Sequence, residues 1–272
     1  MALAMQQQRI EPTTQPTAES VAIELRNVTV AYRSYKERPT TLKESIIRSV
    51  RTRSLRHFST FNALSDVSFQ IPRGSVTGII GSNGSGKSTL LKVLAGVLRP
   101  SKGFVNVNGS IGSLIELGIG FDPEMNAVEN ILLNGSLHRR TSEEMRTRIP
   151  NILAFSELEE FSTTPIKYYS SGMLARLGFA TAIDIDPDVL LVDEVLGVGD
   201  ERFQNRCHEV FRRFFESEKT IVMVSHDLEM LQKKTQRIIL VSRGHIVFDG
   251  DPETAVRMYR DNSYETALRK NV

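Results

Sequence analysis

A glycine-rich stretch, GSNGSGKST, constrains the fold of this chain more than any other part of its sequence. It runs from Gly81 to Thr89 and contains a glycine, four residues and then Gly-Lys-Ser, which is the phosphate-loop pattern. The β-rich run VTGII precedes it, and LLKVLAGVL follows it with apolar residues at three- and four-residue intervals. A strand, a glycine loop and a helix in this order predict an α/β fold with a phosphate site at the helix N-terminus.

The loop residues have distinct expected roles around a nucleoside triphosphate. Backbone amides of the glycine loop form a concave nest for phosphate oxygens, and the following helix adds its positive end. We expect Lys87 at the β and γ phosphates, Ser88 on Mg²⁺ and Thr89 at the α phosphate. The predicted phosphate-binding residues are Gly81, Ser82, Asn83, Gly84, Ser85, Gly86, Lys87, Ser88 and Thr89.

Two carboxylates end the apolar run VLLVDE at residues 189–194. Such runs are typical of parallel strands that are covered on both faces, and the ends of these strands lie where ligands bind. Phosphoryl transfer to water needs a carboxylate for the metal and a group that orients the nucleophile. We therefore predict that Asp193 binds Mg²⁺ and that Glu194 is the general base for the attacking water.

The rest of the chain shows strand patterns on both sides of a helical segment. VAIELRNVTVAY alternates as a strand does from Val21 onward, and IILVSRGHIVFDG indicates a closing hairpin. Residues from about 117 to 183 are mainly helical in pattern. Residues 1–20 are rich in Gln, Thr and Pro and predict a flexible tail, and we expect a C-terminal tail at 261–272.

Composition and charge exclude several classes of protein. The chain is 40% hydrophobic and 24% charged, which is typical of soluble globular domains, and its single cysteine, Cys207, allows no intrachain disulfide. No run approaches the roughly 20 apolar residues that cross a bilayer, so we expect a cytoplasmic protein. The net charge of +2 gives no electrostatic reason to expect a nucleic-acid partner.

The order of the motifs resembles that of the ATP-binding subunits of ABC transporters, over about residues 21–260. YSSGM at residues 169–173 resembles the family's LSGGQ signature, and VGD at 198–200 resembles its D-loop. His226, after TIVMVS, occupies the position of the family's switch histidine. The resemblance implies that Ser170, Ser171 and Gly172 close on the ATP of a second protomer, that Asp200 lies at the dimer seam, and that His226 contacts the γ phosphate.

Two further positions follow from the resemblance. Tyr32 resembles the aromatic residue that stacks on adenine, although Tyr35 competes for that role. Glu116 stands where most family members have a glutamine that reaches Mg²⁺. A carboxylate there would bind the metal more strongly and respond more to pH, and direct contact with Mg²⁺ stays an open question.

The family implies an architecture and a cellular role. The expected fold is an α/β P-loop NTPase of the ABC ATPase type, with a RecA-like core, an antiparallel β subdomain and a helical subdomain. YSSGM, VDEVLGVGD, ELGIGFDPE and the insertion after Tyr32 are similar to exporters of lipid-linked polysaccharide. We therefore expect a homodimer that hydrolyses ATP with Mg²⁺ and drives an integral-membrane permease dimer, at the cytoplasmic face of the inner membrane. The alternative is a soluble ABC ATPase without a permease, acting in cofactor assembly, nucleic-acid transactions or translation.

The insertion at residues 33–60 is strongly basic, although the net charge of the whole chain is close to zero. It contains eight basic and two acidic residues, a net +6, so the rest of the chain has a net charge of −4. Leu42, Ile46 and Val50 recur every four residues, which predicts a basic amphipathic helix over about 41–51. We expect this segment to reach an anionic membrane surface and help receive the pyrophosphate head of a lipid carrier.

Overall fold

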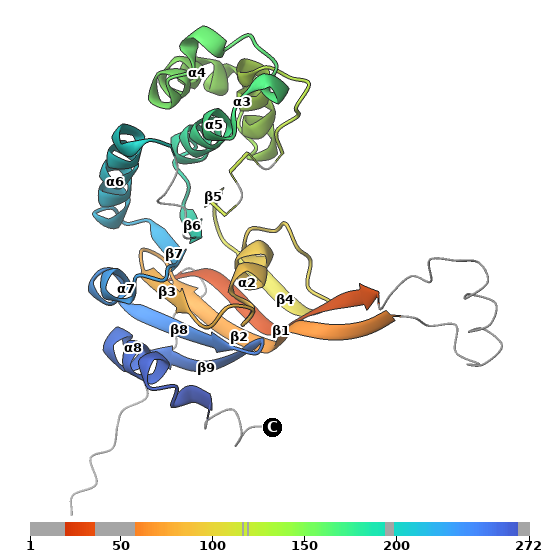
Figure 1. Cartoon of the computed structure of the whole chain (residues 1–272), viewed down its shortest axis with the longest axis vertical. Coiled ribbons are helices and arrows are strands. Elements are labelled where there is room, and N and C mark those ends of the chain that lie inside the picture. The colour runs from red at the N-terminus through yellow and green to blue at the C-terminus, as the bar shows by residue number, and fades with distance from the viewer. Residues whose placement is uncertain (1–19, 36–57, 116, 119, 194–198, 266–272) are drawn as a thin grey trace, which may run out of the picture.

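The computed structural model describes residues 20–35, 58–115, 117–118, 120–193 and 199–265. These residues form two β-sheets, one helix between them and a layer of helices at one end (Figure 1). Among these residues, none of the helices has both the length and the apolar character needed to span a bilayer. The expectations for residues 1–19, for the basic helix at 41–51, and for Glu116 and Glu194 fall outside the described residues.

A six-stranded sheet forms the centre of the molecule, with the order β5-β6-β7-β3-β8-β9. Its strands are β3 (Val76–Ile80), β5 (Ile111–Ser113), β6 (Val189–Asp193), β7 (Thr220–Val224), β8 (Arg237–Ser242) and β9 (His245–Gly250). The strands pair in parallel except β9, which pairs antiparallel to β8 and so forms the predicted hairpin. Every residue of β3 and β7 is buried, as the continuous apolar runs predict for strands covered on both faces.

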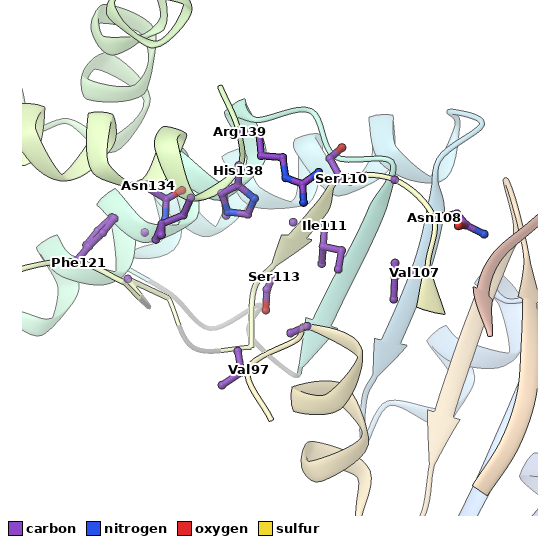
Figure 2. A pocket seen from close by; sticks show the side chains of 17 residues that line it. Val97, Val107, Asn108, Ser110, Ile111, Ser113, Phe121, Asn134, His138 and Arg139 are labelled. Carbon is purple, nitrogen blue, oxygen red and sulfur yellow. The ribbon is translucent and has the colours of Figure 1, made fainter. Parts of the chain in front are cut away.

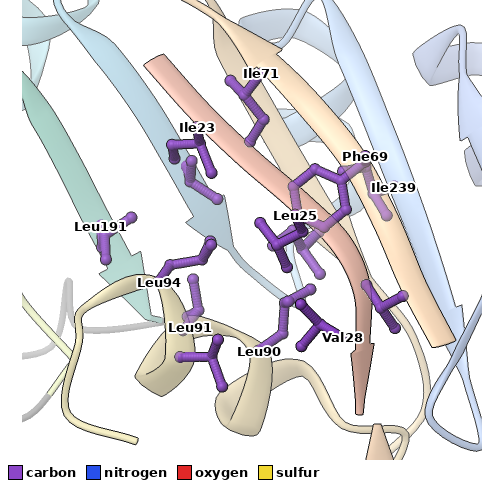
Figure 3. Close-up of a cluster of buried hydrophobic side chains, with 14 of the residues drawn as sticks. Ile23, Leu25, Val28, Phe69, Ile71, Leu90, Leu91, Leu94, Leu191 and Ile239 are labelled. Atoms are coloured by element: carbon purple, nitrogen blue, oxygen red, sulfur yellow. The ribbon is translucent and has the colours of Figure 1, made fainter. Parts of the chain in front are cut away.

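A three-stranded antiparallel sheet packs against the first one. Its order is β2 (Phe58–Pro72), β1 (Val21–Tyr35), β4 (Lys102–Val107). Helix α2 (Lys87–Leu94) lies between the sheets, and its leucines join a cluster with strand residues from both (Figure 3). Beyond the part of β1 that pairs with β4, β1 and β2 continue as a two-stranded ribbon that ends at the pair Tyr35–Phe58 (Figure 1).

Helices α3 (Ala127–Leu137), α4 (Ser142–Ser156) and α5 (Ser171–Asp184) form the layer at the top of Figure 1, with short 3₁₀ turns η2 (Glu159–Phe161) and η3 (Ile166–Tyr168). Capping boxes begin two of these helices: Asn126 with Glu129, and Thr141 with Glu144. A separate apolar cluster, which includes Ile131, fills the space between the three helices. The helical pattern predicted for this part of the sequence is therefore present.

The remaining helices are α6 (Glu201–Phe215), α7 (Leu228–Lys234) and α8 (Pro252–Arg260), which cover the other face of the central sheet. Among residues 261–265, which the sequence analysis assigned to a tail, Tyr264 is buried and the other four residues are exposed. Tyr264 is 5% exposed and its ring stacks on Tyr259 at 6.1 Å. A single aromatic side chain beyond residue 260 thus joins the apolar cluster of the fold.

Candidate functional site

Three parallel strands bring the predicted site residues to one edge of the central sheet. Val224 at the end of β7 pairs with Ile79 of β3 on one side and with Asp193 of β6 on the other. Because the carboxyl ends of parallel strands meet at the same edge, the phosphate loop after β3, Asp193 and His226 lie at neighbouring strand ends. The sequence analysis placed each of these residues after a strand but gave no strand order, so the pairing supplies their proximity.

Lys87 is folded back over the phosphate loop. Its side chain is 9% exposed, and Nζ donates hydrogen bonds to the carbonyl oxygens of Gly81 at 2.7 Å and Ser82 at 3.1 Å. The ammonium group is thus held at the mouth of the loop rather than extended into solvent. A buried lysine in this position presents a positive charge to whatever occupies the loop.

Neighbouring strands support the loop from behind. Gly86 has φ of 113°, and a Cβ there would lie 2.6 Å from the carbonyl oxygen of Ala63 on β2. The Gly244 N–H, in the turn between β8 and β9, donates to the carbonyl oxygen of Ser85 at 2.8 Å. Only glycine at residue 86 permits this close approach of the loop to β2.

The N-terminus of α2 differs from that of every other described α-helix. Its N-cap, Gly86, provides no side-chain hydrogen bond, and its first turn has no acidic residue. The other six described α-helices each have a side-chain oxygen that accepts from a first-turn amide, from Asn126, Thr141, Ser170, Asp200, Asp227 and Asp251. In addition, Ser85 Oγ is buried and has no hydrogen-bond partner within the described residues. These features leave the positive end of α2 for an anion and fit the phosphates of ATP.

The other loop residues differ in accessibility. Ser82, Asn83, Gly84 and Ser88 are exposed, and Thr89 is half-buried on the first turn of α2. Ser88 and Thr89 directly follow Lys87, so their hydroxyls lie beside the loop that they were predicted to serve. These oxygens are the hard donors that Mg²⁺ and phosphate contacts require.

Asp193 is half-buried as the last residue of β6, and His226 is exposed two residues beyond the end of β7. The next residue, Asp227, caps α7 by accepting from the Met230 N–H at 2.9 Å. This cap fixes the start of α7 and with it the backbone next to His226. Glu194 follows Asp193 directly in the sequence but lies outside the described residues.

An aromatic pair lies on the ribbon formed by β1 and β2. Tyr32 pairs with Phe61 in the strand register, and their rings stack at 5.7 Å between centroids. Phe61 is 56% exposed, and Ala63, two residues further on, contacts the phosphate loop at Gly86. Sequence reasoning missed Phe61. Its signal was an aromatic residue in the strand that pairs with Tyr32.

The predicted signature residues form a second, separate helix N-terminus. Ser170 caps α5 by accepting from the Met173 N–H at 3.2 Å, and Ser171 and Gly172 begin the helix. Ser170 and Ser171 are exposed. Asp200 is likewise exposed, and it caps α6 by accepting from the Phe203 N–H at 2.9 Å. The helical layer that contains α5 lies apart from α2, which packs under the three-stranded sheet (Figure 1).

Comparison with known proteins places these features in a family. The model of the ABC transporter family matches residues 64–197. The O-antigen export system ATP-binding protein RfbB of Klebsiella pneumoniae is 38% identical over 88% of this chain and 97% of its own length. This chain belongs to the ABC transporter family.

Other members of the ABC transporter family match over different shares of their length. An RfbB protein of Myxococcus xanthus is 41% identical, but the chain spans only 56% of it. The teichoic acids export ATP-binding protein TagH of Bacillus cereus is 39% identical, and the chain spans 42% of it. The chain thus spans about half the length of these two relatives and nearly the whole length of the Klebsiella one.

Solved structures show the same ABC ATPase fold. A dimeric ATP-binding cassette bound to ADP and Pi matches with a TM-score of 0.63 and 23% identity over 85% of this chain and 98% of its own. An ATP-binding subunit of an ABC transporter matches with a TM-score of 0.66 and 20% identity, over 91% and 99%. The expected fold class is confirmed, and as an ABC ATPase the chain binds ATP with Mg²⁺ and hydrolyses it.

A groove separates the nucleotide-binding edge of this ABC ATPase from its helical layer. It encloses about 690 Å³, and its walls are the end of α2, the segment from β4 to β5, the end of α3 and one face of α5 (Figure 2). Val97 is 50% exposed and Leu137 is 62% exposed on its rim. Burial and the nearby Arg140 lower the pKa of His138 in its wall, so this imidazole is neutral at pH 7.

Proposed function

We propose that this chain is the ATPase subunit of an exporter of lipid-linked polysaccharide and that it dimerises around two ATP molecules. One observation carries the dimer. Helix α2 begins without a side-chain cap behind the phosphate loop, while α5 begins at the exposed Ser170 and Ser171, and the two helices belong to different parts of the fold. A second copy would bring its Ser170, Ser171 and Gly172 against the ATP on this copy's phosphate loop, with Asp200 at the seam.

Within each half-site, the residues have the following proposed roles. Lys87 holds the β and γ phosphates, and His226 contacts the γ phosphate and orders the attacking water. Glu194 takes the proton of that water as general base. Tyr32, supported by its stack on Phe61, receives the adenine.

The proposed metal ligands are Ser88 and Asp193, and Glu116 is proposed to contact the metal directly or through water. When bound, Mg²⁺ would supply positive charge that offsets the negative charge of the phosphates. The hydroxyl of Ser88 and the carboxylate of Asp193 are oxygen donors, which suit this ion. The remaining loop residues bind phosphate through backbone amides.

The coupling to transport is proposed from the relatives and from the groove. The relatives named above are ATP-binding subunits of O-antigen and teichoic acid export systems. The groove lies between the helical layer and the rest of the fold, so a permease segment seated there would respond when the two move relative to one another. We propose that a permease dimer docks at this groove and holds the ATPase peripherally at the cytoplasmic face of the inner membrane.

The dimer is tested with the Glu194→Gln variant. Loss of the general base should slow hydrolysis by about 10²–10⁴-fold and leave ATP affinity intact. Because ATP then persists between the protomers, size-exclusion chromatography with light scattering should show a dimer with Mg²⁺-ATP and a monomer without it. A variant that hydrolyses ATP at the normal rate would refute the role of Glu194, and one that stays monomeric with ATP would refute the dimer.

The transport role is tested by copurification and reconstitution. The chain should copurify with a protein of several transmembrane helices, and in proteoliposomes the lipid-linked glycan should stimulate hydrolysis. Leu137→Glu on the groove rim should abolish copurification without changing the ATPase activity of the isolated subunit. If no membrane protein copurifies and no lipid-linked glycan stimulates ATP hydrolysis, the result would support the alternative of a soluble ABC ATPase without a permease.

A further inference from the structure

A single carboxylate links the two helices that begin at Ser170 and Asp200. Glu157 Oε2 accepts a hydrogen bond from Arg176 Nη1 on α5 at 2.9 Å, and its Oε1 accepts one from Arg206 Nη2 on α6 at 2.6 Å. Each arginine lies six residues after the N-cap of its helix. With a rise of 1.5 Å per residue, the carboxylate holds both helices about 9 Å from their N-caps.

The surroundings of Arg206 tie the helical layer to α6. Its guanidinium lies 5.4 Å from the ring centroids of both Phe155 on α4 and Phe203 on α6. The two rings meet edge to face at 5.6 Å, and Phe203 also contacts Phe179 of α5 at 5.8 Å. Arg206 thus packs where α4, α5 and α6 meet, and its planar, charged head suits both the rings and the carboxylate.

The two arginines of this network are partly buried, and Glu157 between them is exposed. Arg176 is 20% exposed, Arg206 is 35% exposed and Glu157 is 40% exposed. Water and salt screen half-buried charges less than fully exposed ones. Because one ordered Glu157 side chain serves two ion pairs, less side-chain entropy is lost per ion pair than if each arginine had its own carboxylate.

The backbone of Glu157 is held in a conformation that glutamate does not favour. It is the C-cap of α4, with φ of 56° and ψ of 45°, where glycine is the usual residue. The Leu158 N–H donates to the Leu153 carbonyl oxygen at 3.0 Å, and the buried Leu158 side chain fixes this helix end. From this helix end, the carboxylate of Glu157 bonds to both arginines.

We propose that Glu157, Arg176 and Arg206 form an intersubdomain clamp that fixes Ser170 relative to Asp200. The clamp rests on the proposed dimer, in which both residues must reach the partner at the same time. A small rotation of α5 against α6 would move Ser170 away from the partner's nucleotide while Asp200 stayed in place. These three are positioning residues, because they act through the helix N-termini and do not touch the nucleotide.

The test uses Glu157→Gln in the full chain, with and without Glu194→Gln. We expect unchanged affinity of the monomer for Mg²⁺-ATP, because the phosphate loop is untouched. In the Glu194→Gln background, the dimer should dissociate at a concentration about tenfold higher, and in the wild-type background kcat should fall about fivefold or more. A general loss of fold would lower ATP affinity as well, so unchanged affinity together with weaker dimerisation and a lower kcat indicates a positioning role.

Two matched variants separate positioning from stability. Glu209→Gln removes an ion pair with Arg212 that lies within α6, at 2.8 Å, and should change neither dimerisation nor kcat. Glu157→Gly relieves the left-handed backbone, so it should not lower the melting temperature, yet it should show the same dimer defect as Glu157→Gln. If Glu157→Gln and Glu209→Gln behave alike, the clamp is wrong.

A distance measurement on the monomer tests the clamp separately from the proposed dimer. Spin labels on cysteines introduced at Tyr168 and Glu201 report the distance between the segment preceding Ser170 and the start of α6. The distribution of distances should broaden in Glu157→Gln without any partner, and an unchanged distribution would overturn the clamp. Failure of Glu194→Gln to dimerise, with this distribution broadened as expected, would overturn the proposed dimer alone.

Discussion

The ammonium group of Lys87 lies 2.7 Å from the carbonyl oxygen of Gly81, the residue that opens the phosphate loop. The lysine at the end of the loop therefore bonds to its beginning, and a second bond to Ser82 completes the closure. These two bonds hold the charge at the mouth of the loop. Less side-chain entropy is then lost on binding, because the lysine needs little further ordering.

Lys87→Ala should lose most of the affinity for ATP. Charge-assisted hydrogen bonds contribute about 1.5–3 kcal/mol each, which corresponds to a loss of at least about tenfold in affinity. Isothermal titration calorimetry measures this directly. Lys102→Ala, an exposed lysine on β4, is the control and should bind as the wild type does. Unchanged binding by Lys87→Ala would refute the phosphate role.

Gly86→Ala should disrupt the loop more than Gly84→Ala does. Both glycines have positive φ, 113° and 75°, but a Cβ at residue 86 meets the Ala63 carbonyl oxygen at 2.6 Å and one at residue 84 meets nothing within 4 Å. We expect Gly86→Ala to cost about 2–4 kcal/mol, from strain plus overlap, and Gly84→Ala about 1 kcal/mol, from strain alone. Urea denaturation of both variants gives the two values. Equal losses would show that the contact with β2 does not matter.

Asp188→Asn should destabilise the protein in a pH-dependent way. Asp188 Oδ2 accepts from the N–H and the hydroxyl of Ser110, both at 2.7 Å, and these bonds hold the pKa of Asp188 below its usual 3.8. A lowered pKa means that the stabilisation is present above pH 3.8 and is lost as the pH falls through the folded-state pKa. For this exposed group, we expect a loss of about 1 kcal/mol at pH 7.

Urea denaturation at pH 7 and near pH 3 should show the difference between wild type and Asp188→Asn shrinking at the lower pH. Asp186→Asn is the matched control, because Asp186 forms an ion pair with Lys219 at 3.2 Å and its side chain is 67% exposed. Its effect should be smaller at both pH values. A constant difference for Asp188→Asn would contradict the linkage.

Cys207 should resist alkylation until the protein unfolds. The thiol is 2% exposed, and burial raises its pKa to about 12. A raised pKa leaves the thiol neutral at pH 8, and the neutral form does not attack iodoacetamide. Mass spectrometry should find no adduct on the native protein and one adduct in about 6 M guanidinium chloride, which unfolds most domains.

Much of the fold could be predicted because local patterns determined it. The apolar runs of β3, β6 and β7 could only be buried strands, and the glycine loop between β3 and α2 needs the backbone freedom that its glycines provide. Asp193 and His226 could be expected near the same sheet edge, because a residue at the end of a parallel strand reaches that edge whatever the helices do.

Other features depend on segments that meet only in space. The sequence analysis did not identify Phe61, because its contact with Tyr32 depends on the register between β1 and β2. Tyr264 was assigned to a tail because one aromatic residue near a polar end gives no periodic signal, yet it completes an apolar cluster. Neither could be derived from a window of neighbouring residues.

The sequence by itself determined the phosphate loop, the strand that ends at Asp193 and the helix that begins at Ser171, because each depends on spacing within about ten residues. Only the tertiary structure decided that Ala63 supports Gly86 and that Glu157 joins Arg176 to Arg206. Such contacts depend on how the layers pack, and packing is a property of the whole chain. Local spacing therefore determines what chemistry is present, and the packing determines how the groups are held.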